Sequence, residues 1–302
     1  MPSLTTAAPA FALALFALPC LGAEPVELVY LFDADAPVRY VTVQDSTQEQ
    51  SIQGQNMTSD TSVTTHTTVR LLEANEDGSI LLGNTTDRVE FSLNVPGMEV
   101  DYDSANPQDR AKLSNPTVAS MAGTVGLDIH LLVASDGTIL DVPNIGDLQK
   151  AVAAMEDPTA QAGAAAVTNK DTVMATQEMQ FKLLPQEAVE PGDTWKREFK
   201  VPFPFGEMTT SFDLTLDSVE DGIASISITG SMSMPQIVEQ QVTMTMSDAK
   251  VTGSMRFDID DGVVDAMNMT TVMNMDGTMQ GMPEPILSMT MTQRVKMNRV
   301  EE

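Results

Sequence analysis

Over most of its length the chain alternates apolar and polar residues with a period of two, in runs rich in Thr, Val, Ser, Ile and Met. Successive side chains of a strand point to opposite sides of a sheet, so this alternation is typical of strands with one buried face. The alternating segments are Tyr40–Val43, Thr61–Leu72, Ile80–Leu93, Leu127–Val133, Ser211–Val219, Ile223–Met234, Val242–Met246, Gly253–Ile259 and Val263–Met275. The chain is therefore predicted to be mainly β.

Asp-Gly pairs separate many of these runs. A type I′ turn needs positive φ at both central residues, so Asp-Gly between alternating runs predicts a tight hairpin. The pairs are Asp77-Gly78, Asp136-Gly137, Asp221-Gly222, Asp261-Gly262 and Asp276-Gly277. Their repetition favours an antiparallel meander.

One stretch follows a helical period instead. Its apolar face consists of Ile145, Leu148, Val152 and Met155, which recur at three- and four-residue spacing. Asn144 is the expected N-cap, with Asp147 completing a capping box, and Pro158 is expected to end the helix. An Ala-rich link (Ala160–Ala166) and a second helix over Asn169–Gln180 should follow. We therefore expect a helical insert at about 144–180.

These patterns predict a single β-rich domain over residues 24–302. Antiparallel strands with one buried face, together with a helical pair, favour a curled antiparallel sheet or half-barrel whose concave side the helices cover. A β-sandwich or a closed barrel is the alternative. Strands are expected to resume after a turn at Pro191-Gly192.

Residues 1–23 are predicted to be a secretory signal peptide. The uncharged apolar run Ala10–Leu18 has the length of a signal h-region, and cleavage is expected after Ala23. Attachment of lipid at Cys20, the only cysteine, is the alternative. No other segment approaches the length needed to span a bilayer. The mature chain is therefore expected to be exported, as a periplasmic, cell-surface or secreted protein that needs no disulfide.

The formal net charge of −27 makes nucleic acid an unfavourable partner, because phosphate would be repelled. The acidity is interpreted chiefly as a means of staying in solution, with a calcium-dependent role as the alternative. No segment has the spacing of an EF-hand loop.

The sequence yields no catalytic residue. Its two histidines, His66 and His130, lie inside predicted strands, and no nucleophile elbow, zinc-protease motif or phosphate-binding loop is present. The close acidic groups are Asp33/Asp35, Asp101/Asp103 and Asp258/Asp260/Asp261. Paired carboxylates could serve a hydrolase, but one Trp and three Tyr are a poor supply of platforms for sugar binding. The last acidic group is interpreted as a hairpin rather than a metal loop.

Methionine is concentrated in the C-terminal part of the chain. Of the 22 methionines in the whole sequence, 14 lie from Met232 to Met297. Many form Met-x-Met pairs, which place both side chains on one face of a strand. Such a face could be ordinary core, an adaptable lining for an apolar ligand, or a Cu(I) site. The residues predicted to bind a ligand are Met244, Met246, Met267, Met269, Met273 and Met275; no metal site and no cofactor are assigned.

Three short motifs resemble a known family. They are Asp101-Tyr102-Asp103-Ser104, Ser135-Asp136-Gly137-Thr138-Ile139, and Leu184-Pro185 with Pro191-Gly192-Asp193-Thr194-Trp195. Together they resemble a family of exported bacterial proteins known only as domain of unknown function 6263, a resemblance that implies no activity and supplies no catalytic residues. In outline the chain is also similar to the half-barrel lipoprotein carriers of the bacterial periplasm, which is an analogy of architecture only.

Taken together, these features favour an exported, non-enzymatic protein that binds or carries an apolar small molecule or lipid on its Met-rich sheet face. A carboxylate-dependent hydrolase and a purely structural cell-envelope protein are the alternatives.

Overall fold

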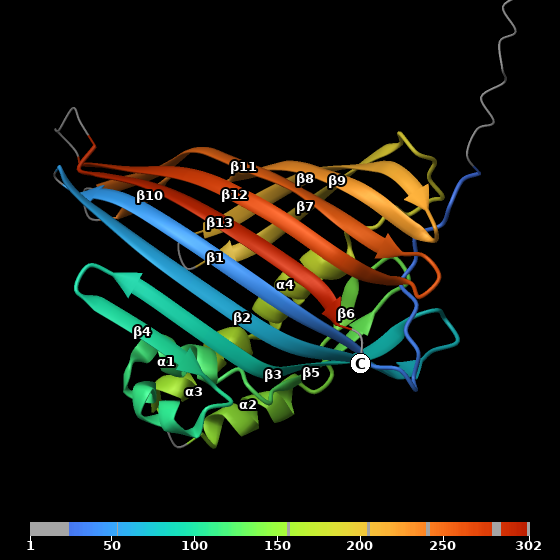
Figure 1. Ribbon diagram of the computed structural model, residues 1–302, viewed down its shortest axis with the longest axis horizontal. Helices are drawn as coiled ribbons and strands as arrows, with labels where there is room; N and C mark the ends of the chain where they lie inside the picture. The colour runs from blue at the N-terminus through green and yellow to red at the C-terminus, as the bar shows by residue number, and fades with distance from the viewer. Residues whose placement is uncertain are drawn as a thin grey trace, which may run out of the picture.

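The computed structural model describes residues 24–52, 54–155, 158–203, 206–239, 242–279 and 285–300. The predicted signal peptide and Cys20 lie outside the described residues. Within them, one antiparallel sheet dominates, accompanied by a few short helices (Figure 1). The prediction of a mainly β chain is therefore confirmed.

The elements follow one another in two groups of strands around a helical region. The first group is β1 (Val38–Ile52), β2 (Gln55–Ala74), β3 (Ile80–Val95), β4 (Met98–Asp103), β5 (Asp128–Val133) and β6 (Ile139–Asp141). The helices are η1 (Pro107–Ser114), α1 (Pro116–Ala122), α2 (Ile145–Ala153), α3 (Pro158–Val167) and α4 (Lys170–Phe181). The second group is β7 (Thr194–Phe203), β8 (Gly206–Glu220), β9 (Ile223–Ser233), β10 (Ile237–Glu239), β11 (Val242–Asp258), β12 (Val263–Met279) and β13 (Leu287–Val300).

The sheet order is β6-β5-β3-β2-β1-β13-β12-β11-β9-β8-β7, with β4 paired to β3 and β10 to β11. The first strand, β1, pairs with the last strand, β13, in the middle of the sheet. This pairing joins the two groups of strands into one sheet. The sheet curls, while its terminal strands β6 and β7 do not pair with each other (Figure 1). The half-barrel prediction is confirmed, and the closed barrel and the sandwich are excluded.

Helix α4 contacts both terminal strands and so fills the gap between them. The carbonyl groups of the C-cap residue Lys182 and of Leu183, just after the helix, accept hydrogen bonds from another part of the chain. The Trp195 indole N–H donates to the Leu183 carbonyl at 2.7 Å, and the Arg197 Nε–H donates to the Lys182 carbonyl at 2.9 Å. Both donors belong to β7, so the motif residue Trp195 is part of the seam that joins this helix to the sheet edge.

Four of the five Asp-Gly pairs form turns between strands, as predicted. Only Asp221-Gly222 has positive φ at both residues, 51° and 77°, as a type I′ turn requires. The fifth prediction is wrong, because Asp276-Gly277 lies inside β12, where Gly277 pairs with Met244 and Leu287. A Cβ at Gly277 would come within 2.9 Å of the Met244 sulfur. This glycine therefore leaves space for the Met244 side chain and does not form a turn.

The helical insert is present but is organised differently from the prediction. Pro158 begins α3 instead of ending α2, and the Ala-rich link is that helix, since alanine has the highest helix propensity. Asn169 caps α4 as expected. Asn144 precedes α2 without capping it by its side chain, which instead bonds the backbone of β5 at Asp128 and His130. The prediction missed η1 and α1, whose residues lack apolar periodicity.

The core lies on the inner face of the sheet, the face that α4 covers. It is densest near the residues where β1 and β12 begin, around Tyr40, Phe257 and Val264, all 6% exposed or less. The chain before β1 crosses this region, and Tyr30 packs edge-on against both Phe181 of α4 and Phe257 of β11. We call this the closed end of the inner face. The open end is the opposite one, where β1 and β12 finish at Ile52 and Met279.

Candidate functional site at the open end of the sheet

Strand register shows which methionines share the inner face. Met246 pairs with Met275, and Met275 pairs with Met289, so three adjacent strands each contribute one methionine to a single cross-strand row. In the neighbouring row Met273 pairs with Met291. Residues directly opposite each other in antiparallel strands have Cβ atoms about 4.5–5.5 Å apart. We call these five residues the Met patch.

The six predicted ligand-binding residues divide between the two ends of this face. Met267 and Met269 are half-buried and pack against the main core near the closed end. Met244, Met246 and Met275 are also half-buried but lie at the open end, where Met273 is 8% exposed. The predicted set therefore shares one face, and Met244, Met246 and Met275 combine partial exposure with a position away from the main core. The six predicted residues do not include Met289 and Met291, although these two also form a Met-x-Met pair in the sequence.

A β-bulge brings Met244 and Met246 to the inner face. The register of β11 against β12 shifts between Met246 and Asp248, which leaves Ser247 as the extra residue. Without that extra residue, the alternation that points Ala249 inward would send Met246 outward. The bulge is thus the feature that completes the Met patch.

Polar and apolar side chains of β1 and β2 continue the same rows. Gln50 pairs with Met289, and Gln48 pairs with Met291. The Gln48 amide donates to the Met289 sulfur at 2.9 Å. Ile52 and Met57, also on this face, remain 43% and 42% exposed. The open end therefore keeps accessible apolar surface beside the thioethers.

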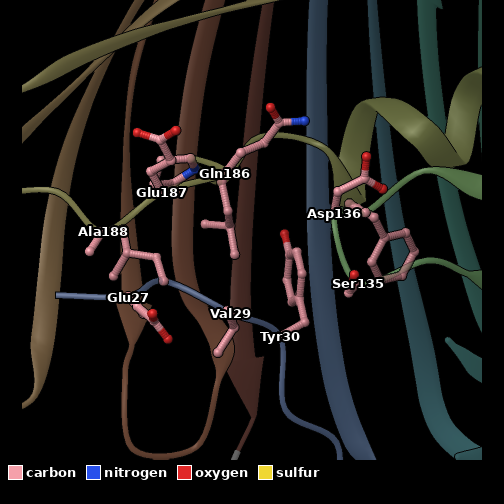
Figure 2. A pocket seen from close by; sticks show the side chains of 13 residues that line it. Glu27, Val29, Tyr30, Ser135, Asp136, Gln186, Glu187 and Ala188 are labelled. Atoms are coloured by element: carbon pink, nitrogen blue, oxygen red, sulfur yellow. The ribbon is translucent and has the colours of Figure 1, made fainter. Parts of the chain in front are cut away.

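A cleft of about 320 Å³ lies at the closed end (Figure 2). It lies between the segment containing Glu27 and Tyr30, the turn at Ser135–Gly137, and the loop after α4 that carries Glu187. Its lining includes parts of two of the three family motifs, namely Ser135-Asp136-Gly137 and Leu184-Pro185. Burial raises the pKa of Tyr30 well above its usual value, and its hydroxyl donates to the Gln180 carbonyl at 3.0 Å. Tyr30 thus forms one wall of this cleft and ties it to the end of α4.

The described carboxyl groups with a displaced pKa all shift in the same direction. Each has its pKa lowered, which keeps these aspartates ionised at neutral pH. For Asp103, the largest cause is its hydrogen bonding with the Arg88 guanidinium. For Asp136 in the cleft, it is the backbone N–H of Thr138.

The two histidines lie in strands, as predicted, and each faces one acid. The Nε2 atom of His66 is 3.5 Å from Glu90, and that of His130 is 3.2 Å from Asp128. The group Asp258/Asp260/Asp261 forms a hairpin, in which the Asp258 carboxylate accepts from the backbone N–H groups of Asp260 and Asp261. Across the described residues, no three His, Cys, Asp or Glu side chains cluster closely enough to hold a metal ion. None of the helices described is long and apolar enough to cross a membrane.

Comparison with known proteins identifies a family that the chain matches, but that family has no known activity. Residues 77–284 match the family of unknown function DUF6263. No curated protein matches the sequence.

Three solved structures share a distant likeness with the chain. DynF of the dynemicin biosynthesis pathway of Micromonospora chersina is 7% identical, with a TM-score of 0.19, over 96% of this chain and 92% of that one. An outer membrane channel of Pseudomonas putida F1 is 8% identical, with a TM-score of 0.25, over 92% and 100%. OccK5 (OpdH) of Pseudomonas aeruginosa is 6% identical, with a TM-score of 0.26, over 90% and 100%. TM-scores this low carry no argument about function.

Proposed function

The chain belongs to the DUF6263 family of unknown function, and we propose that it binds an apolar small molecule or lipid on the open end of its inner sheet face. The observation that carries this proposal is the unequal covering of that face. At the closed end Phe257 and Met255 are 0% exposed, whereas Ile52 and Met57 on the same face remain more than two-fifths exposed.

The chemistry of the Met patch suits an adaptable apolar site. Methionine is unbranched and polarizable, so its side chain adjusts to ligands of irregular shape. The amides of Gln48 and Gln50 lie next to the patch and offer hydrogen bonds to a polar end of the ligand. An amphiphile with a neutral or weakly polar end, rather than a strongly anionic one, matches a protein of net charge −27.

Export is part of the same proposal. The apolar run Ala10–Leu18 supports a signal peptide, and a carrier of apolar molecules has a natural role outside the cytoplasm, in the periplasm, at the cell surface or in the medium. N-terminal sequencing of the protein from its native host tests this part. A free N-terminus at Glu24 is expected, while an intact Met1 in the cytoplasmic fraction would contradict export.

The binding proposal is tested with a fluorescent probe that has a long alkyl chain and an uncharged polar end, and with two glutamine variants, Met246→Gln and Met275→Gln. Glutamine keeps the length of methionine but introduces an amide, and burying such a group without a partner costs about 1–3 kcal/mol. Each variant should therefore bind the probe about tenfold more weakly. Thermal unfolding measured in parallel should change little, because both side chains are only half-buried.

The matched control is Val272→Gln. Val272 lies on β12 between Met273 and Thr271, but it points to the outer face and is 38% exposed. This variant should bind the probe as the unmodified protein does. Unchanged probe binding in Met246→Gln and Met275→Gln, or an equal loss in Val272→Gln, would overturn the proposed site.

A further inference from the structure

We propose that the Met patch also holds one monovalent soft metal ion, Cu(I), through the sulfur atoms of Met246, Met275 and Met289. This inference goes beyond the proposed function, since it concerns the lone pairs of the sulfur atoms rather than the apolar surface of the side chains. It begins from the cross-strand row in which β11, β12 and β13 each place one methionine directly beside the next.

The backbone brings the three sulfur atoms within common reach. Adjacent strands lie about 4.7–4.9 Å apart, so the two outer methionines of the row flank Met275 within roughly 10 Å of each other. A methionine side chain has three rotatable bonds, which lets its sulfur move toward a shared point between the strands. The second row, Met273 and Met291, places two further thioethers on the same face.

Thioether ligands select the metal by softness and by charge. Sulfur donors of Met favour Cu(I), whereas Mg²⁺, Ca²⁺ and Mn²⁺ prefer oxygen donors. Three neutral thioethers supply no negative charge, so a monovalent ion leaves less uncompensated charge at the site than a divalent one. The net charge of −27 of the whole chain attracts cations in general.

The local structure leaves these sulfur atoms available. Met246, Met275 and Met289 are all half-buried, so an ion can reach them from the open end. The polar contact made to this row is the Gln48 amide, which donates to the Met289 sulfur at 2.9 Å. A thioether sulfur has a second lone pair, so this contact orients Met289 without consuming its capacity as a ligand. The bulge at Ser247 matters here as well, since it is what turns Met246 toward Met275.

The test is an anaerobic titration in which the protein competes with a chromophoric Cu(I) chelator. The unmodified protein should withdraw one equivalent of Cu(I) from the chelator. The variants Met246→Leu, Met275→Leu and Met289→Leu keep an apolar side chain of similar size while removing the sulfur. Each should weaken Cu(I) binding by at least about tenfold, the lower end of what a change at the periphery of a metal site costs.

Two controls separate this inference from general effects of substitution. Met255→Leu removes a sulfur from the same strand β11 at a fully buried core position, and it should leave Cu(I) binding unchanged. The leucine variants of the patch should retain binding of the uncharged alkyl-chain probe, because they preserve the apolar surface. The two proposals can therefore fail separately: the glutamine variants test the apolar site, and the leucine variants test the sulfur ligands.

Three results would overturn the inference. The first is an unmodified protein that takes no Cu(I) from the chelator. The second is uptake that persists in the triple leucine variant, which would place the metal elsewhere. The third is an X-ray absorption spectrum of the Cu(I) complex with oxygen or nitrogen neighbours in place of sulfur. Ag(I), a redox-inert soft ion, serves as a second probe and should lose binding in the same variants.

Discussion

The closed and open ends of the inner sheet face use the same residue type in different surroundings. At the closed end Met255 is 0% exposed and pairs with Met267 beneath a core that α4 and the chain around Tyr30 cover. Met267 itself is half-buried but packs on that core. At the open end Met246 and Met275 pair in the same way across the same two strands, and both are half-buried away from the core. The surroundings of a methionine here therefore depend on which elements cross over that part of the sheet and not on its strand or its spacing.

The covering elements explain the difference. Helix α4 is anchored at the closed end by β7, through Trp195 and Arg197, and its aromatic residue Phe181 packs on Tyr30. The open end has exposed apolar residues on the same face, Ile52 and Met57. Stability is therefore concentrated at one end, and adaptable surface is available at the other.

Alanine substitution at matched methionines gives the largest expected contrast. Met255→Ala removes a fully buried side chain and should lower the free energy of unfolding by about 2–5 kcal/mol, as large-to-small core changes do. Met275→Ala should cost clearly less, because part of that side chain is already in contact with solvent. Urea denaturation of both variants measures the difference. Equal losses would mean that the open end is packed as tightly as the closed end.

A pair of turn glycines gives the next largest effect. Gly137 at the closed end has φ +82°, and a Cβ there would lie 2.1 Å from the Phe181 carbonyl oxygen. Gly97, in the turn between β3 and β4, has φ +86°, and a Cβ added there would meet no neighbouring atom within 4 Å. Alanine at either position costs about 1–2 kcal/mol for the left-handed backbone. Gly137→Ala should lose about 1–3 kcal/mol more through overpacking against α4.

Thermal unfolding of the two glycine variants measures this difference. A Gly97→Ala variant as unstable as Gly137→Ala would show that the contact between the turn and the end of α4 contributes nothing to the closed end.

The ion pair between α4 and β6 gives the smallest expected effect. Lys170 Nζ lies 2.6 Å from the Asp141 carboxylate and is the largest cause of the lowered pKa of Asp141. A lowered pKa in the folded state stabilises the fold above the unfolded value of about 3.9 and loses that effect as the pH falls through the folded value. Both side chains are more than two-fifths exposed, so the pair should contribute under about 1 kcal/mol.

Thermal unfolding of Asp141→Asn should therefore differ slightly from the unmodified protein at pH 7, and the two should converge below about pH 4. Asp147→Asn is the control, because its ion pair with Lys150 lies within one helix and joins no other element. A difference in stability that grows as the pH falls would contradict the role assigned to Asp141 in joining β6 to α4.

Much of the fold could be predicted because it depends on local chemistry. Period-two alternation and four of the Asp-Gly turns identified most of the long strands, and Asn169 marked the start of α4. The predicted segments did not include β4, β6, β10 or β13. The Ala-rich segment was misassigned as a link because alanine leaves no apolar periodicity, although its helix propensity was a usable signal. Asp276-Gly277 was misassigned because a glycine that gives space to a side chain looks the same in sequence as one that makes a turn.

Residue type and spacing were enough to predict the β class and the thioether-rich character of the C-terminal strands. The choice of a half-barrel over a closed barrel or a sandwich needed the pairing of β1 with β13 and the unpaired edges β6 and β7. The division of the methionines between core and Met patch likewise followed from contacts between distant parts of the chain. One extra residue at Ser247 reverses the facing of every side chain before it in β11, and that bulge is defined only by the pairing with β12. Likewise, the covering of the closed end depends on contacts between α4 and strands at the two ends of the sheet order, which no local pattern encodes.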